Sequence, residues 1–360
     1  MRMRVLIAPD KFAGTLTAVQ AAEAIAEGWR RRAPDDELDL APMSDGGPGF
    51  VDVIHAAVGG DLLAVTVEGP YGDPVPALVL RHGDTAYVES AQACGLALTR
   101  DGDPEKASTY GVGQLLAAAV DSGAKRVILG LGGSGTTDGG AGLLAALGAE
   151  PAPSLRAGAA GLAGLDTVSL PAAPAVEIVI ASDVDNPLTG LFGAAKTYGP
   201  QKGIAEDRLP AVDGLLEHFA ARTDRRLALA KGAGAAGGLG FALLLLGGTR
   251  TPGIDLVADL VGLSERARTA DLVVTGEGAF DFSSRSGKVP YGVAHVAAEA
   301  LRPCIALAGQ VLIGSREMRV LGIEAAYSLA DLVGLDRALS DPAGSLAELA
   351  QRTARTWSRE

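Results

Sequence analysis

The chain has 360 residues, 48% hydrophobic and 21% charged, which is ordinary for a well-packed globular protein and long enough for two domains. Acidic residues outnumber basic ones by 43 to 31, and the net charge of −12 argues against a general nucleic-acid binder, which needs a basic face. The amino-terminal apolar run is too short for a signal peptide, and the longest apolar run, "LGFALLLLGG", is about half the length that spans a bilayer. We therefore expect a cytoplasmic protein with no nucleic-acid or membrane partner. Cys94 and Cys304 are far apart in the sequence, which predicts two buried thiols and no disulfide.

The first predicted element is a strand at 4–10, "RVLIAPD", followed by an amphipathic helix. Thr17 is a plausible N-cap, and Gln20 lies three residues further on, where a capping box needs it. Apolar residues then recur on one helical face, and "RRRAPDD" closes the helix. The sequence therefore begins with a βα unit.

Residues 61–90 have a different pattern. Three apolar runs, "DLLAVTVEG", "PVPALVLR" and "DTAYVES", are separated by turns at hairpin-like spacing. This pattern predicts an antiparallel meander and a domain boundary near residue 60. The segment 151–175, rich in Pro, Gly and Ala, has no clear period and indicates a connector.

Continuous aliphatic runs predict further strands at 125–133, 176–183, 271–278 and 304–310. Such runs are typical of parallel strands that are covered by helices on both faces. Because the βα pattern returns at 271–310, after the meander, we expect the first domain to be discontinuous.

The segment "GLGGSGTTDGG" (130–140) matches the dinucleotide pattern G-x-G-x-x-G at Gly130, Gly132 and Gly135. That pattern also needs a second strand ending in an acidic residue, and Glu150, at the right distance, lies among turn residues. A P-loop is not present either, because Val289 follows Lys288 in "SRSGKV". A different phosphate cradle and a plain tight turn both stay open for this loop.

Gly-rich loops at predicted strand ends carry acidic residues, and four such loops together indicate a ligand site at the sheet edge. Their carboxylates could hold Mg²⁺ or accept a proton from a substrate hydroxyl. These acidic residues are Asp45, Asp138, Asp183, Asp185, Glu277 and Asp281.

Cations lie beside the same loops, at Lys11, Lys196, Lys202, Arg285 and Lys288. Each could be a solvated surface charge, but together with the acidic loops they favour phosphoryl transfer, which depends on charge neutralisation and positioning. The loop "GAGAAGGLG" (232–240) is either a close-packing element or a phosphate lid.

Eight motifs occur in order between residue 8 and about residue 310: "APDKFAGTLTA", "SDGGPG", "STYGVGQLL", "GLGGSGTTDGGAG", "SDVDNPLTG", "YGPQKG", "GAGAAGGLG" and "TGEGAFD…SGKVP". This set resembles the type-1 bacterial glycerate kinases. The resemblance implies an α/β fold of two domains with the active site in the cleft between them. We assign 1–60 with 260–360 to a discontinuous Rossmann-like domain with a parallel sheet, and 61–259 to a second α/β domain with a mixed sheet.

The resemblance also implies that the protein uses ATP and Mg²⁺ to phosphorylate D-glycerate, on the 2-hydroxyl, to give 2-phosphoglycerate and ADP. We expect a monomer or a homodimer. The alternatives are phosphorylation at the 3-hydroxyl or of a related hydroxy acid, and a catalytically silent sensor of a nucleotide or sugar acid. Ala13 and Pro48, which depart from the commonest family pattern, motivate the sensor alternative.

On this hypothesis Lys11 or Arg285 binds the substrate carboxylate, and Asp45 and Asp281 also contact substrate. Asp183 is the first choice for the residue that accepts the hydroxyl proton, and Asp138 is the second. Asp183 and Asp185 are the predicted Mg²⁺ ligands, and Lys288 offsets charge on the transferred phosphoryl group. The predicted nucleotide contacts are Gly132, Gly133, Ser134, Gly237, Gly238 and Glu277.

Overall fold

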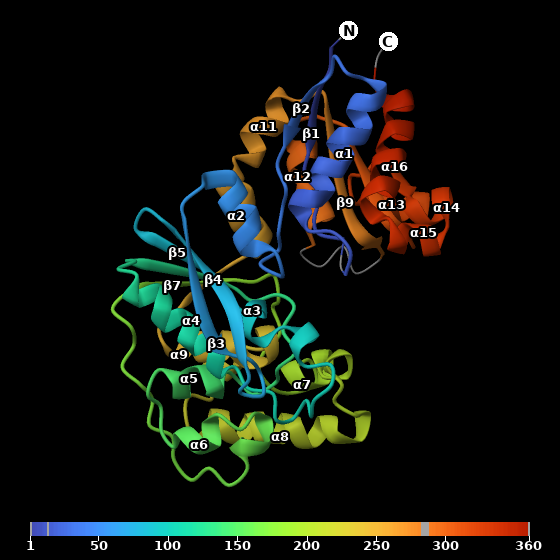
Figure 1. Ribbon diagram of the computed structural model, residues 1–360. Helices are drawn as coiled ribbons and strands as arrows, with labels where there is room; N and C mark the ends of the chain where they lie inside the picture. The colour runs from blue at the N-terminus through green and yellow to red at the C-terminus, as the bar shows by residue number, and fades with distance from the viewer. Residues whose placement is uncertain (1, 13, 282–287, 359–360) are drawn as a thin grey trace. The chain divides into compact units, whose positions relative to one another are not determined.

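Two β-sheets organise the residues that this computed structural model describes, which are 2–12, 14–281 and 288–358. The chain divides into two compact units (Figure 1). Unit 1 comprises Met1–Asp45, Asp52–Val58 and Ile254–Glu360, and unit 2 comprises Gly46–Val51 and Gly59–Gly253. The predicted α/β fold with a parallel and a mixed sheet is confirmed.

The sheet of unit 1 is parallel throughout, with the strand order β11-β10-β9-β1-β2. Its strands are β1 (Arg4–Ile7), β2 (Glu37–Leu40), β9 (Leu272–Phe280), β10 (Cys304–Val311) and β11 (Ala325–Ser328). The helices are α1 (Ala18–Arg32), α11 (Leu263–Thr269), α12 (Val289–Glu299), α13 (Ser315–Val320), α14 (Leu329–Val333), α15 (Leu335–Ser340) and α16 (Pro342–Trp357). The chain changes unit between Asp45 and Gly46, within and at the end of α2 (Phe50–Val58), and within α10 (Gly253–Val261).

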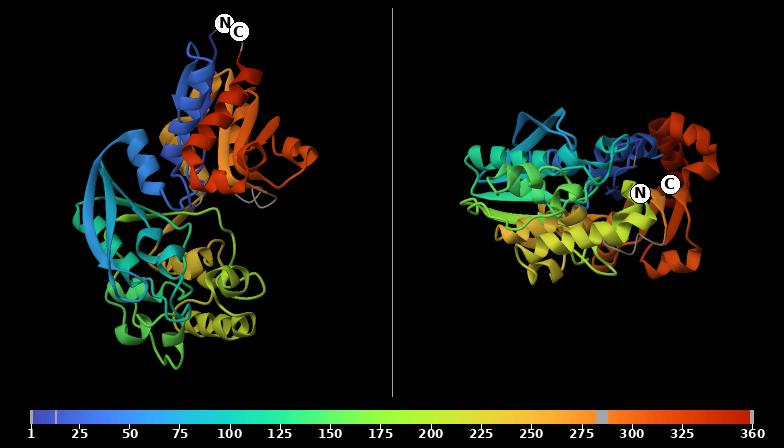
Figure 2. Two further views of the ribbon diagram at one scale, coloured as in Figure 1. Left: turned by 45° about the vertical axis from the view of Figure 1, so that its right-hand side comes forward. Right: turned by 90° about the horizontal axis from the view of Figure 1, so that it is seen from below.

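Helices α1 and α16 lie side by side in unit 1 (Figures 1 and 2). The predicted capping box of α1 is present, because Gln20 N–H donates to Thr17 Oγ1 at 3.1 Å and the Gln20 side chain accepts from Thr17 N–H at 3.0 Å. The two helices approach closely at Gly28, where a Cβ atom would lie 1.9 Å from the Ala347 carbonyl oxygen. The residue at position 28 therefore sets the spacing of α1 and α16.

Strand order changes direction between β1 and β9. From β1 the chain crosses to β2 on one side, and from β9 it crosses to β10 on the other side. In open α/β sheets, such a switch point at the carboxyl ends of the strands is where ligands bind. The residues that follow β1 and those at the end of β9 therefore occupy the most favourable binding position of unit 1.

Unit 2 has a mixed sheet with the order β3-β4-β5-β6-β7-β8. The predicted meander is its antiparallel part, and β5 to β8 run parallel. The strands are β3 (Asp61–Glu68), β4 (Pro74–His82), β5 (Thr85–Glu89), β6 (Arg126–Gly130), β7 (Glu177–Ala181) and β8 (Thr249–Thr251). The α-helices are α3 (Ala91–Cys94), α4 (Tyr110–Asp121), α5 (Ala141–Ala146), α6 (Ala152–Leu155), α7 (Ala194–Tyr198), α8 (Leu209–Ala221) and α9 (Leu239–Leu245). Short 3₁₀ turns lie at Leu96–Leu98, Ala159–Leu162, Pro200–Lys202, Glu206–Arg208, Leu227–Leu229 and Ala235–Gly238.

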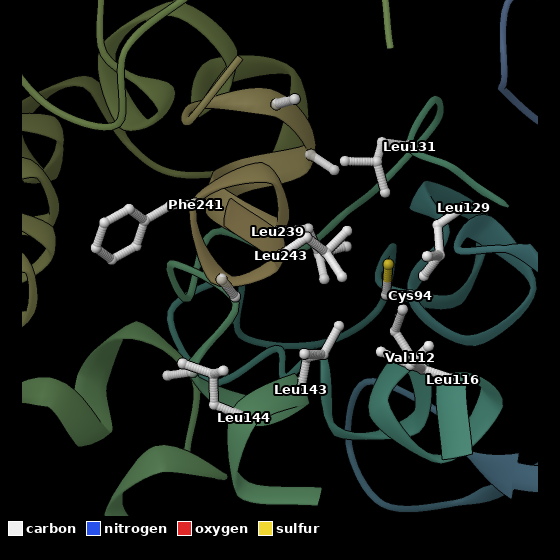
Figure 3. Packing of buried hydrophobic residues seen from close by; sticks show 14 of the residues in the cluster. Cys94, Val112, Leu116, Leu129, Leu131, Leu143, Leu144, Leu239, Phe241 and Leu243 are labelled. Atoms are coloured by element: carbon white, nitrogen blue, oxygen red, sulfur yellow. The ribbon is translucent and has the colours of Figure 1, made fainter. Parts of the chain in front are cut away.

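The core of unit 2 consists mainly of small and aliphatic side chains, together with the aromatic residues Phe219 and Phe241 (Figure 3). Leu129 from β6, Val112 from α4, Leu143 from α5 and Leu243 from α9 all belong to it and are fully buried. Cys94 lies in the same core, and both cysteines are buried free thiols, as predicted. The loops that leave β6 and β7 are therefore held on a rigid base.

Candidate functional site

A charged cluster lies at the switch point of unit 1, where Asp10 and Lys11 follow β1. Lys11 Nζ is 3.3 Å from Asp10 Oδ1 and 3.4 Å from Asp45 Oδ1. Burial disfavours the Lys11 ammonium, but the carboxylates of Asp45 and Asp10 outweigh burial, so the pKa of Lys11 is raised. Lys11 is therefore a permanent cation at neutral pH, as capture of a substrate carboxylate requires.

Asp10 is the member of this cluster that sequence reasoning missed. Its side chain is buried, and burial is the largest of the effects that raise its pKa to about 7; Lys11 opposes the shift, while Asp45 and Glu277 add to it. The available signal was its place at the carboxyl end of the first predicted strand, directly before Lys11. Asp10 can thus either donate or accept a hydrogen bond near neutral pH.

Lys288, the residue directly before α12, is the second lysine of this cluster. Its Nζ lies 3.4 Å from Glu277 Oε2 and 3.6 Å from Asp281 Oδ1, so the structure brings these three predicted residues together. Arg285, the alternative carboxylate-binding residue, lies outside the described residues, as does Ala13. Of the two predicted carboxylate-binding cations, only Lys11 lies within the part of the chain that the structure describes.

A cavity of about 380 Å³ lies against this cluster, entirely within unit 1. Its polar side carries the two lysines with Asp10, Asp45 and Glu277. Its apolar side is formed by Phe12 and by leucines of α14 and α15. The cavity therefore offers two cations and several hydrogen-bond acceptors to a small, hydroxylated anion.

In unit 2 the Gly-rich loop 130–140 follows β6 and packs on backbone from other loops. Gly132 N–H donates to the Gly46 carbonyl at 3.0 Å, so this predicted phosphate donor is already engaged. Gly133, which has a φ of +74°, packs against Pro48, where an added Cβ atom would lie 2.6 Å from the proline ring. Pro48 thus has a packing role in this chain.

The second Gly-rich loop, 232–240, lies directly on the first. A Cβ atom at Gly237 would lie 1.9 Å from the Thr136 carbonyl oxygen, and one at Gly238 would lie 2.4 Å from Gly139 Cα. Gly139 N–H also donates to the Gly237 carbonyl at 3.0 Å. Of the two alternatives for this loop, the geometry agrees with close packing, and the predicted nucleotide contacts Gly237 and Gly238 face the neighbouring backbone.

Asp138, the second choice for the proton acceptor, has no exposed surface. Its Oδ2 accepts from Thr109 N at 2.9 Å, Thr109 Oγ1 at 2.8 Å and Gly142 N at 3.2 Å, and its Oδ1 accepts from Gly140 N at 2.9 Å. Burial raises the pKa of Asp138, while these four hydrogen bonds oppose the rise. This carboxylate joins the start of α4 to the start of α5, a connection that sequence reasoning missed.

Asp183 and Asp185, the predicted Mg²⁺ ligands, follow β7 in unit 2. Asp185 lies 2.7 Å from Arg250 Nη2 and 3.5 Å from Lys231 Nζ, one cation at each carboxylate oxygen. Within the described residues, no three His, Cys, Asp or Glu side chains are grouped so that they could hold a metal ion. Asp185 is thus paired with two cations, and the assignment of Asp183 and Asp185 as Mg²⁺ ligands stays a prediction.

Lys202 was noted among the cations but given no role. Its side chain is 6% exposed, and its Nζ donates to Ser134 Oγ at 3.0 Å and to the Thr136 carbonyl at 2.7 Å. The sequence leaves two interpretations for this position, a solvated surface charge and a cation that takes part in phosphoryl transfer. The structure shows a buried lysine attached to the loop that contains Ser134.

The family model described as "Glycerate kinase family" matches residues 5–358. The chain belongs to the glycerate kinase family. A glycerate kinase of Halalkalibacterium halodurans is 42% identical over 97% of this chain and 96% of its own length. The glycerate 2-kinase of Escherichia coli K12 is 36% identical over 98% of both chains. A solved structure, the putative glycerate kinase 2 from Salmonella typhimurium LT2, matches 99% of this chain and 98% of its own, at 35% identity and a TM-score of 0.79.

Membership of this family confirms the predicted enzyme class, a kinase, and the predicted resemblance. It agrees with the fold, since the structural match extends over almost the whole of both chains. No helix among the described residues is long and apolar enough to cross a membrane.

Proposed function

We propose that this protein transfers the γ-phosphoryl group of ATP to the 2-hydroxyl of D-glycerate, giving 2-phosphoglycerate and ADP. The observation that carries the proposal is the charged cluster at the β1/β9 switch point, in a chain that belongs to the glycerate kinase family over 5–358. The name of the E. coli relative favours the 2-position.

In unit 1 the substrate carboxylate pairs with Lys11, which is cationic at neutral pH. Asp10 and Asp45, already within 3.4 Å of Lys11 Nζ, accept hydrogen bonds from the glycerate hydroxyls. Lys288 offsets the negative charge of the transferred group. Glu277 and Asp281 hold the Lys288 ammonium in position through their ion pairs with it. Recognition of a small hydroxy acid thus depends on residues that all belong to one unit.

In the transfer step the substrate oxygen forms a bond to the γ-phosphorus as the bond from that phosphorus to the ADP oxygen breaks. The hydroxyl proton passes to a carboxylate, and we assign this role to Asp183. Asp138 is the weaker candidate, since all four of its hydrogen bonds are made within the protein. Mg²⁺ ordinarily accompanies ATP and neutralises the charge of its phosphates.

The test is an assay of ADP release by the purified protein with ATP and either D-glycerate or L-glycerate, followed by NMR of the product. A phosphate on O2 has one neighbouring proton and gives a phosphorus doublet, whereas a phosphate on O3 has two and gives a triplet. We expect ADP release with D-glycerate and a doublet. A triplet would move the reaction to the 3-hydroxyl, and nucleotide binding without ADP release would favour the sensor alternative.

Replacement of Asp183 by Asn tests the assignment of the proton acceptor. Asp183 is half-buried two residues beyond β7, and Asn has nearly the same size and shape, so the substitution should leave the fold intact. Loss of a general base typically costs about 10²–10⁴-fold in rate, and we expect kcat to fall by this amount with an unchanged melting temperature. Near-normal kcat would remove Asp183 from the role.

A further inference from the structure

Lys202 forms a cross-link between two distant segments of unit 2. It ends the 3₁₀ turn Pro200–Lys202, and its ammonium donates hydrogen bonds to Ser134 Oγ and the Thr136 carbonyl. Gly203, with a φ of +89°, ends this turn in the left-handed conformation that glycine adopts readily. The Lys202 side chain thus fixes the central part of loop 130–140 through its hydrogen bonds to Ser134 and Thr136.

The positive charge of Lys202 has no carboxylate partner. Among the described residues Lys202 Nζ makes no ion pair with an Asp or Glu, and both of its contacts are to neutral oxygens. The charged or titratable groups that bear on it are Cys94 and Asp138, of which the first is a buried thiol and the second is satisfied by four donors. Burying an uncompensated cation is costly, and lysines are rarely buried without a partner.

The loop that Lys202 contacts also contains a buried hydroxyl group without a hydrogen-bond partner in the described part of the chain. Thr137 is 1% exposed, and its buried hydroxyl has no hydrogen-bond partner among the described residues. An ammonium has three N–H donors, and only two of those of Lys202 are used within the protein. A bound anion supplies what this region lacks, which is negative charge and acceptor oxygens.

We propose that Lys202 is a positioning residue for nucleotide binding. It fixes loop 132–137, to which the ATP phosphates bind in this proposal, and it places a positive charge next to that loop. This inference rests on the proposed use of ATP. Lys202 acts through Ser134 and Thr136, which it contacts directly, and by its field on the phosphates.

The test compares K202Q and K202R with the wild type by calorimetric titration of ADP and by steady-state kinetics. Gln can donate from its amide but is uncharged, whereas Arg keeps the charge. Loss of a charge-assisted interaction typically corresponds to about 10–100-fold, so we expect the Kd of ADP and the KM of ATP to rise at least 10-fold in K202Q. We expect the KM of D-glycerate to stay within twofold, and K202R to recover most of the affinity.

The matched control is K125Q, because Lys125 is a largely exposed lysine of unit 2 that pairs with Asp84 at 2.8 Å. We expect wild-type nucleotide affinity for it. Unchanged ADP affinity in K202Q, or an equal rise in the KM of D-glycerate, would overturn the inference.

If the variants do not fold, the wild-type protein provides the second measurement. Burial lowers the pKa of Lys202 to about 8. ADP affinity should therefore fall as the pH rises from 7 to 9.5, and constant affinity over that range would also overturn the inference. If the wild-type protein binds ADP but releases none from ATP with D-glycerate, the proposed reaction is refuted. The ADP affinities of K202Q and K202R then still decide whether Lys202 positions the nucleotide.

Discussion

Replacing Asp138 by Asn should destabilise unit 2 rather than remove a proton acceptor. The side chain has no exposed surface, and its two oxygens accept four hydrogen bonds from Thr109, Gly140 and Gly142. Asn keeps one acceptor oxygen, which can occupy the Oδ2 position and retain three of these bonds. Its NH₂ group then faces the buried N–H of Gly140, and both groups are donors.

The size of the effect follows from those contacts. A buried N–H without an acceptor costs about 1–3 kcal/mol, and the three retained bonds lose the assistance of a charge. Relief from burying a carboxylate, whose pKa burial raises, offsets part of this loss. We expect a net loss of about 2 kcal/mol, which lowers the melting temperature of a unit of roughly 200 residues by about 4–8 °C.

The assay pairs thermal unfolding with kcat for D138N and D183N. We expect D138N to melt earlier and to keep kcat within about tenfold of the wild type below its transition. D183N should melt normally and lose kcat. The reasoning is refuted if D138N melts like the wild type while its kcat falls by 10³-fold or more, since that result would make Asp138 the proton acceptor.

The remaining predictions concern unit 1 and packing. The pKa of Asp10 is raised to about 7, so the folded state holds a proton between pH 4 and 7 that the unfolded state has released, and stability falls as pH rises through this window. D10N should remove this loss and melt at least about 4 °C above the wild type at pH 8, with a smaller gain at pH 4.5. K288M should lower kcat/KM at least about 100-fold with an unchanged circular dichroism spectrum, because it removes the cation beside Glu277. G28A should destabilise unit 1 by about 1–3 kcal/mol or more in denaturant titrations, because its Cβ atom would overlap the backbone of α16. G214A, on α8 with no atom within 4 Å of the added Cβ, should instead be neutral or stabilise by up to about 1 kcal/mol.

The strands that lie inside the two sheets could be predicted because their cores are continuous aliphatic runs. The strands that were missed, β2, β8 and β11, are three or four residues long and lie at sheet edges. In β2, "ELDL", every residue is half-buried, and charged residues alternate with leucine. An edge strand of this kind is specified by its neighbour in space, and local periodicity carries little of that information.

The site residues show the same division between local and distant information. Lys11, Glu277 and Lys288 could be predicted because each lies beside a Gly-rich loop at a strand end, and the structure places all three against one cavity. The contacts of Asp138 could not be predicted, because "TDGG" is equally compatible with an exposed base and with an internal cap. Its partner Thr109 lies 29 residues upstream. The burial of Lys202 could not be predicted for the same reason, since it contacts Ser134, 68 residues away.

The contact between loops 130–140 and 232–240 restricts how this enzyme can be engineered. Because Gly237 and Gly238 face backbone atoms of Thr136 and Gly139, no side chain can be added at these two positions unless the loop 130–140 moves. If residues 130–140 were replaced by the same loop from a relative, the new backbone would have to pack against the unchanged loop 232–240, for which it did not evolve. Chimeras and randomised libraries of this region should therefore exchange both segments together.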